Sequence, residues 1–263
     1  MATWFLFGKL IGVATFIGFG EKRCRKNLPL GVAGQTLSTP QSDLWNAYLE
    51  AEHRGLRSER NDALERYLES FAELPVASQH EWSLELASDI VDDGASTPVR
   101  MPLFRRAILP ALEAAIATRT PGAARWFAGF AQHIYKCADL KPRLIDGSLT
   151  EHTLLLTAIE HDANDSTARR KLLDLLVRRL DYTLHELPSG VLYGHDGATV
   201  DQCREMLGEL DDFTHHAQIL GVTDDYFDLV AQCRFHYNTY AEYLTDRRGT
   251  SCYADYLSQV SDA

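Results

Sequence analysis

Apolar residues recur at intervals of three and four along most of the chain, from Ser42 onward. In one clear example, Leu64, Tyr67, Leu68 and Phe71 fall at i, i+3, i+4 and i+7 and therefore share one face of a helix. The sustained two-residue alternation that is typical of half-exposed strands does not occur. The pattern predicts an all-α domain over residues 42–263, an irregular stack of about nine or ten helices in antiparallel hairpins, either repeat-like or a bundle.

Local signals predict where several helices begin and end. Capping boxes, in which two side chains satisfy backbone donors at a helix start, are predicted at Ser78–Glu81, Ser148–Glu151 and Thr199–Gln202. Gly221 favours the left-handed backbone that ends a helix. Pro110 lacks a backbone N–H, so we expect a kink or two short helices around it.

The joint at residues 159–169 combines an apolar helix end, an acidic turn that contains Asn164, and the start of a new helix. It resembles the turn between successive units of tetratricopeptide-repeat proteins. The Trp/Gly/Tyr/Ala/Pro pattern of that repeat does not recur at a fixed period in this chain. The resemblance, which covers this joint alone, implies a curved stack of helix pairs with a concave binding face.

Residues 1–41 form an apolar and basic extension followed by a linker, and we expect this part to be poorly ordered. Lys9 is the only charge between Ala2 and Gly20, and a basic cluster follows. Two other interpretations stay open, namely a packed part of the fold and a segment that associates with a membrane through residues 2–26. The last of these would make the protein a membrane-tethered adaptor.

The composition, with 45% hydrophobic and 24% charged residues in 263, is that of an ordinary globular protein. The formal net charge of -11 makes nucleic acid an unfavourable partner for the chain as a whole, because phosphates repel an acidic surface. Five cysteines lie far apart without a CxxC motif. This spacing favours reduced thiols and a cytoplasmic location.

The charge is unevenly distributed along the chain, since residues 99–180 carry +5 and residues 181–263 carry -11. Arginines of the middle segment either pair with the acidic ends or bind an acidic ligand. Eight of the eleven tyrosines lie in the acidic C-terminal third. Tyrosine is enriched at interfaces, and a negative field speeds association with a basic partner. The candidate partner-binding residues are Asp211, Asp212, Asp224, Asp225, Asp228, Tyr226, Tyr237 and Tyr240.

This acidic, aromatic region supports our leading hypothesis, a protein-interaction module that binds a basic protein. Small acidic bacterial proteins that neutralise basic toxins are similar in kind, so an immunity or antitoxin role is its concrete form. In the alternative interpretation, the tyrosines pack between helices and the acids only solvate the surface.

Two His–Asp pairs are the candidates for catalysis. His161-Asp162 resembles the pair of the metal-dependent HD phosphohydrolases, which are also all-α, and that resemblance implies a divalent metal, for which His133 and Asp224 could serve as the remaining ligands. His195-Asp196 lies in a glycine-rich loop ahead of a helix start, where an anion or a catalytic histidine could be held. A capped turn and an ordered connector are the structural alternatives for the two pairs.

A third cluster has the helical spacing of a metal site. His215 and His216 lie one turn after two aspartates, and His236 follows Cys233 at i+3. Two facing helices could bring these histidines to zinc or iron, although surface histidines that pair with acids have the same pattern. No nucleophile, Walker or dinucleotide motif occurs, and we expect no cofactor. Whether the protein is an enzyme stays open, with a preference for a binding role.

Overall fold

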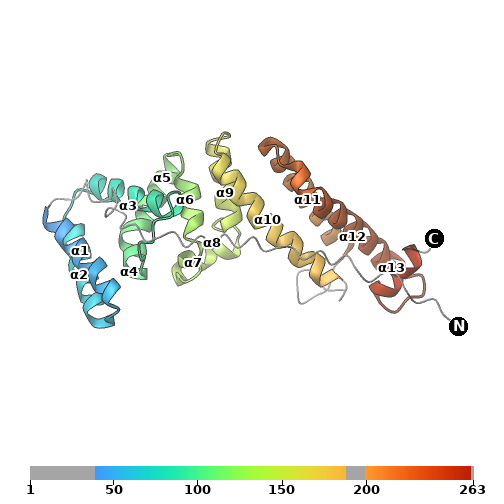
Figure 1. Ribbon diagram of the computed structural model, residues 1–263, viewed down its shortest axis with the longest axis horizontal. Coiled ribbons are helices and arrows are strands. Elements are labelled where there is room, and N and C mark those ends of the chain that lie inside the picture. Colours follow the sequence, from blue (N-terminus) through green and yellow to red (C-terminus); the bar gives the residue numbers. More distant parts are fainter. Residues whose placement is uncertain (1–38, 188–198, 262–263) are drawn as a thin grey trace.

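Helices follow one another along a single row in the computed structural model, which describes residues 39–187 and 199–261 (Figure 1). Within these ranges no strand occurs, so the predicted all-α class is confirmed. The first helix begins at Thr39, slightly before the predicted start of the domain. The segment 2–26, on which the membrane hypothesis depends, lies outside the described residues. None of the described helices has the length and apolar character needed to cross a membrane.

The N-terminal end of the row consists of α1 (Thr39–Arg54), α2 (Arg57–Ala72) and α3 (Val76–Val91). One aromatic ring from each helix meets the others, since Trp45 lies 5.0 Å from Tyr67 and 5.1 Å from Trp82 between ring centroids. The predicted apolar stripe of α2 is buried along its whole length. The capping box predicted at Ser78 is wrong, because Pro75 already provides the extended residue after which α3 begins.

The middle of the row starts with a helical segment that is interrupted by a π-helical turn. It comprises α4 (Met101–Leu103), the π-helical η2 (Phe104–Ile108) and α5 (Leu109–Ala117). The Leu109 N–H bonds to the carbonyl of Phe104 five residues earlier, and Pro110, which has no N–H, follows directly. The irregularity predicted at this proline is therefore confirmed. The next elements are α6 (Ala123–Gly129), α7 (Ala131–Ile134), η3 (Ala138–Leu140) and α8 (Lys141–Ile145).

Two longer helices, α9 (Glu151–His161) and α10 (Ser166–Glu186), meet at the predicted joint. Thr150 forms a capping box with Thr153, so the cap lies two residues after the predicted Ser148. Asp165 caps α10 by accepting a hydrogen bond of 2.8 Å from the backbone N–H of Ala168. The helix break and its acidic turn are thus present, while the tetratricopeptide-like character of the stack stays a prediction.

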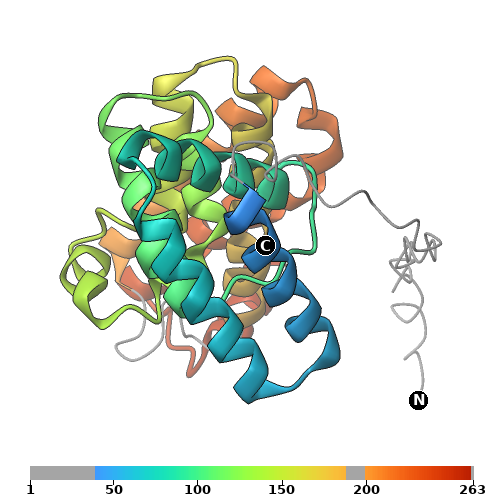
Figure 2. The same ribbon diagram turned by 90° about the vertical axis from the view of Figure 1, so that its left-hand side faces the viewer.

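The C-terminal end consists of α11 (Val200–Leu220), η5 (Thr223–Tyr226), α12 (Phe227–Thr245) and α13 (Tyr253–Ser261). The capping box at Thr199 is present, and Gly221 ends α11 with a φ of +68°. Both predictions are confirmed. Viewed from the α1–α2 end, the helices lie one behind another (Figure 2). The four cysteines of the described ranges are free thiols, and Cys252 alone among them is exposed.

Candidate functional site

The turn between α11 and α12 places an aromatic ring in solvent. Phe227 is the first residue of α12, and its side chain is 69% exposed. Ala231 and Phe235 follow at i+4 and i+8 on the same side of the helix, and Phe235 is 47% exposed. The solvent-facing side of α12 therefore carries an apolar stripe.

Three carboxylates surround the N-terminal end of this stripe. Asp224 and Asp225 lie in η5 and Asp228 lies in the first turn of α12, and all three are exposed. Their side chains form no ion pair or hydrogen bond with the residues that the structure describes. We call the surface made of Asp224, Asp225, Phe227, Asp228, Ala231 and Phe235 the Phe227 face. It combines uncompensated negative charge with exposed apolar area.

The two acids predicted on α11 behave differently from each other. Asp211 is already paired, because its Oδ1 lies 2.6 Å from the Nη2 of Arg234 on α12. Asp212 is exposed and forms no such pair within the described part of the chain. Asp211 therefore adds less negative charge to the surface than the sequence suggested.

The predicted partner-binding tyrosines pack between helices. Tyr237 and Tyr240 are buried, with exposures of 0% and 2%. The ring of Tyr240 stands edge-on against that of Tyr253 on α13 at 4.8 Å between centroids. Tyr226 is half-buried and packs edge-on against Phe213 at 5.2 Å. This placement corrects the expectation that the tyrosines form the binding face, because their rings fill the space between α10, α11, α12 and α13.

Sequence reasoning missed the two phenylalanines that are exposed instead. The signal was present, because Phe227, Ala231 and Phe235 lie outside the stripe that includes the buried Cys233 and Tyr237. A second apolar stripe on a helix that already has a buried one indicates a second contact surface.

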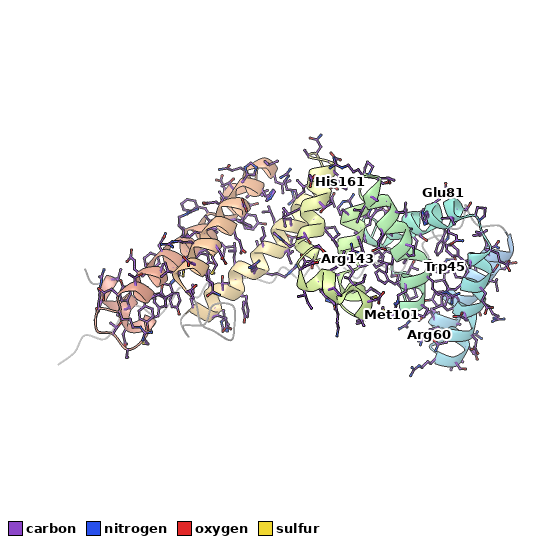
Figure 3. The ribbon with its side chains drawn as sticks, turned by 180° about the vertical axis from the view of Figure 1, so that it is seen from behind. Trp45, Arg60, Glu81, Met101, Arg143 and His161 are labelled. Atoms are coloured by element: carbon purple, nitrogen blue, oxygen red, sulfur yellow. The ribbon has the colours of Figure 1, made fainter. Side chains whose placement is uncertain are left out.

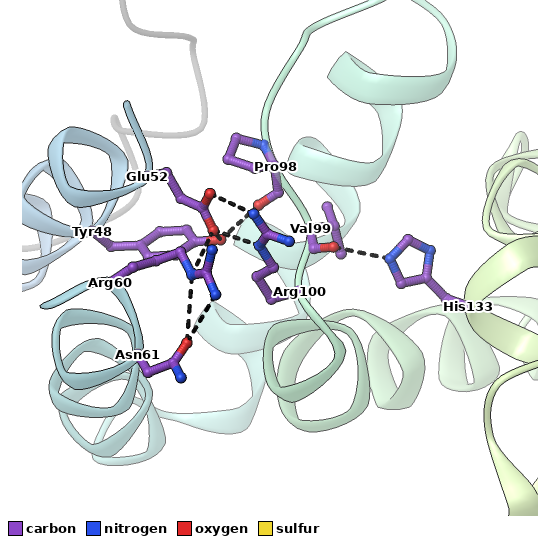
Figure 4. Close-up of polar contacts among 8 residues, drawn as sticks. All are labelled: Tyr48, Glu52, Arg60, Asn61, Pro98, Val99, Arg100 and His133. Atoms are coloured by element: carbon purple, nitrogen blue, oxygen red, sulfur yellow. Dashed lines mark hydrogen bonds and ion pairs between the residues drawn. The ribbon is translucent and has the colours of Figure 1, made fainter. Parts of the chain in front are cut away.

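The HD-like candidates are not brought together. The carboxylate of Asp162 accepts a hydrogen bond of 2.9 Å from the backbone N–H of Asn164 and so shapes the turn after α9. His161 ends α9, on the opposite edge of the row from Met101 (Figure 3). The Nε2 of His133 lies 2.9 Å from the carbonyl oxygen of Val99 (Figure 4). Asp224 lies in η5, and within the described ranges these residues do not converge into the ligand set considered for a metal ion.

The histidines of α11 and α12 also have separate partners. The Nδ1 of His216 lies 2.7 Å from the Nη1 of Arg169, and since a guanidinium only donates, this nitrogen accepts. The Nδ1 of His236 lies 3.1 Å from the hydroxyl of Tyr253. In the described ranges no group of three His, Cys, Asp or Glu side chains is arranged to hold a metal ion. The alternative in which His215, His216 and His236 hold a metal ion is therefore not supported within the described ranges.

Burial controls the protonation of the half-buried histidines. It lowers the pKa of His216, and the positive charge of Arg169 lowers it further. Burial also lowers the pKa of His152 on α9 and that of His236. A neutral imidazole suits the hydrogen bond that His216 accepts from Arg169. The other candidate pair, His195 and Asp196, lies outside the described residues.

Comparison of the chain with protein-family models, with curated proteins and with solved structures gives no match. The geometry of the Phe227 face is therefore the feature that points to a function.

Proposed function

We propose that this chain is a protein-interaction module that binds a basic protein through the Phe227 face. The observation that carries the proposal is the exposed ring of Phe227 beside the three unpaired carboxylates of Asp224, Asp225 and Asp228. Burying a phenylalanine side chain contributes about 1.5–3 kcal/mol, and aromatic anchors of this kind dominate the energetics of many interfaces.

The negative charge of the C-terminal helices indicates that the proposed partner carries a positive surface. Residues 199–261 contain eleven acids and four bases. This excess of negative charge attracts a positive surface over a distance of about one Debye length, which is near 8 Å at physiological salt. The carboxylates would speed the encounter with the partner, and the phenylalanines would hold it once water is displaced.

The proposal is tested by capturing partners on the immobilised full-length chain at low ionic strength and again at about 0.5 M NaCl, where surface electrostatics are screened. Basic proteins that bind only at low salt are then tested individually for direct binding. We expect Phe227→Ala to weaken that binding about tenfold or more, as for truncation of an interface anchor. A triple change of Asp224, Asp225 and Asp228 to Asn should slow association and flatten its salt dependence.

Two matched variants control for nonspecific effects. Ile145→Ala removes another exposed apolar side chain, which is on α8. Glu69→Gln with Glu73→Gln removes exposed carboxylates at the other end of the row. Neither variant should change the binding. Equal losses in the Phe227→Ala and Ile145→Ala variants would show that the Phe227 face is not the binding surface.

An inhibitor of a basic toxin, of the immunity or antitoxin type, is the concrete form that we propose for this module. Such an inhibitor has to reach a positive surface quickly and cover it, which suits a charged rim around an apolar anchor. The direct test is a titration of the captured partner. Its activity should be lost at about one equivalent of the wild-type chain and retained with Phe227→Ala.

A further inference from the structure

A cavity of about 350 Å³ opens at the N-terminal end of the row, where the first turns of α2 meet α4. Its polar wall includes the side chains of Arg57, Arg60 and Arg100, and its apolar wall includes Leu64, Met101 and Pro102. The volume lies at the lower end of the range for small-molecule sites. Three guanidinium groups therefore border one cavity in a chain that carries a net charge of -11.

One half-buried carboxylate, that of Glu52, holds two of these arginines in place (Figure 4). Arg100 donates from its Nε to the Oε1 of Glu52 at 2.5 Å and from its Nη2 to the Oε2 at 2.7 Å. Arg60 reaches the same Oε1 with its Nε at 3.4 Å. The side chain of Glu52 is only 9% exposed. Both carboxylate oxygens of Glu52 are therefore bound by the guanidinium groups of Arg100 and Arg60.

A further hydrogen bond orders the segment that carries Arg100. The hydroxyl of Tyr48 on α1 donates to the carbonyl oxygen of Pro98 at 2.8 Å. Tyr48 and Glu52 lie one turn apart on α1, so the same helix holds both the backbone before Arg100 and its side chain. The guanidinium of Arg100 is therefore held in place before any ligand arrives, and this preorganisation lowers the entropic cost of binding an anion.

The cavity has more positive than negative charge. The hydrogen bonds from Arg100 are the main cause that lowers the pKa of Glu52, which stays ionised, but its single charge is shared by two guanidiniums. The carboxylate of Glu65, at the cavity wall, is bound by Arg106 at 2.5 Å. Arg57 forms no ion pair or hydrogen bond with the described residues. Two positive charges are left without a matching carboxylate.

We propose that this cavity binds a small molecule that carries a phosphoryl group next to an apolar portion. A phosphoryl group has three terminal oxygens and close to two negative charges near pH 7, so it can accept hydrogen bonds from several guanidiniums at once. A carboxylate has two oxygens and one charge and would leave part of this donor set unused. The apolar portion lies against Leu64, Met101 and Pro102.

The test measures binding to the full-length chain by calorimetry at constant ionic strength, with phenyl phosphate, inorganic phosphate and benzoate as probes. We expect saturable binding of one phenyl phosphate, about fivefold or more tighter than either other probe, because inorganic phosphate has no apolar portion and benzoate has one oxygen and one negative charge fewer to offer the guanidiniums. Arg57→Ala should weaken it about tenfold, the usual effect of removing one charged hydrogen-bonding partner. Arg57→Glu should abolish it.

Arg66→Ala is the matched control, because Arg66 is an exposed arginine of α2 that does not line the cavity. It should leave the affinity within about 1.5-fold, as expected for a screened surface charge. Arg57 has no structural partner among the described residues, so its variants should fold normally, which thermal denaturation verifies. Absence of saturable binding, equal affinity for benzoate, or equal losses in Arg57→Ala and Arg66→Ala would each overturn the proposal.

Discussion

The hydroxyl groups of Tyr237 and Thr183 lie 2.6 Å apart inside the core, where α12 packs against α10. The hydroxyl of Thr183 also lies 2.8 Å from the carbonyl oxygen of Leu180. Because a carbonyl only accepts, Thr183 donates to Leu180 and Tyr237 donates to Thr183. A tyrosine that looked like a binding residue in the sequence thus joins two helices through a buried hydrogen bond.

Replacing Tyr237 by Phe should therefore lower stability and leave partner binding unchanged. The change removes one donor, while Thr183 keeps its bond to Leu180. We expect a loss of about 1 kcal/mol and a decrease in Tm of about 3 °C. Thermal denaturation and the partner-binding assay measure the two effects. Loss of the partner at unchanged stability would contradict this structural role.

Removing Arg125 should be much more destabilising than removing an exposed arginine. Arg125 on α6 contacts Asp92 after α3, and its Nε lies 2.9 Å from the Oδ2 of Asp165, which caps α10. These side chains are largely buried. Arg125→Ala leaves two carboxylates uncompensated, and we expect the free energy of unfolding to decrease by about 3 kcal/mol.

Arg119→Ala is the control for this prediction, because Arg119 and its partner Glu160 are 68% and 69% exposed. The expected loss is below about 1 kcal/mol. Urea denaturation of both variants gives the comparison. Similar losses in the two variants would show that the Arg125 cluster does not hold the middle of the row together.

The free energy of unfolding should decrease as the pH is lowered from 7.5 to 5.5. Burial lowers the pKa of His152 and His216 below the ordinary value of 6.5. As the pH falls below that value, the unfolded chain binds protons before the folded chain does. The contribution of the neutral His152 and His216 side chains to folding stability is therefore complete above about pH 6.5. It is lost as the pH falls towards the lower pKa values of the folded state.

Denaturation of a His216→Gln variant at both pH values tests the cause, because a Gln side chain can still accept a hydrogen bond from Arg169 but does not titrate. The difference in stability between the two pH values should be smaller than in the wild type. His53→Gln changes an exposed histidine of α1 and should leave the difference unaltered. An unchanged difference in the His216→Gln variant would exclude His216 as a source.

Adding a methyl group at Gly129 should separate α6 from the end of α3. A Cβ placed there would lie 2.5 Å from the Cγ2 of Val91 and 3.0 Å from its Cγ1. Valine cannot easily turn away, because its branched side chain has few rotamers. We expect Gly129→Ala to cost about 2 kcal/mol, and Val91→Ala in the same chain to recover part of that loss.

Gly208→Ala is the matched control, since no atom lies within 4 Å of a Cβ at that position in α11. Alanine favours the helix more than glycine does, so this variant should gain up to about 1 kcal/mol. Thermal denaturation gives the sign of each change. A stabilising effect at both positions would contradict the close approach of Val91 to Gly129.

Features that depend on residues close together in the chain could be predicted from the sequence. The stripe from Leu64 to Phe71, the cap at Thr199, the stop at Gly221 and the irregularity at Pro110 were all predicted correctly. Each results from backbone hydrogen bonds and backbone dihedral preferences within one or two helical turns. Even the cap after Ser148 was displaced by only two residues, because Thr150 provides the same chemistry.

Which residues of a helix meet solvent or a distant part of the chain depends on the tertiary structure. It buries Tyr237 and exposes Phe227 on the same helix, and it brings Arg100 to Glu52 across 48 residues. It also gives His216 and His236 separate partners. These contacts could not be predicted because a helical pattern only limits which residues can share a face, whereas the neighbouring helices determine which faces are covered and which charges meet.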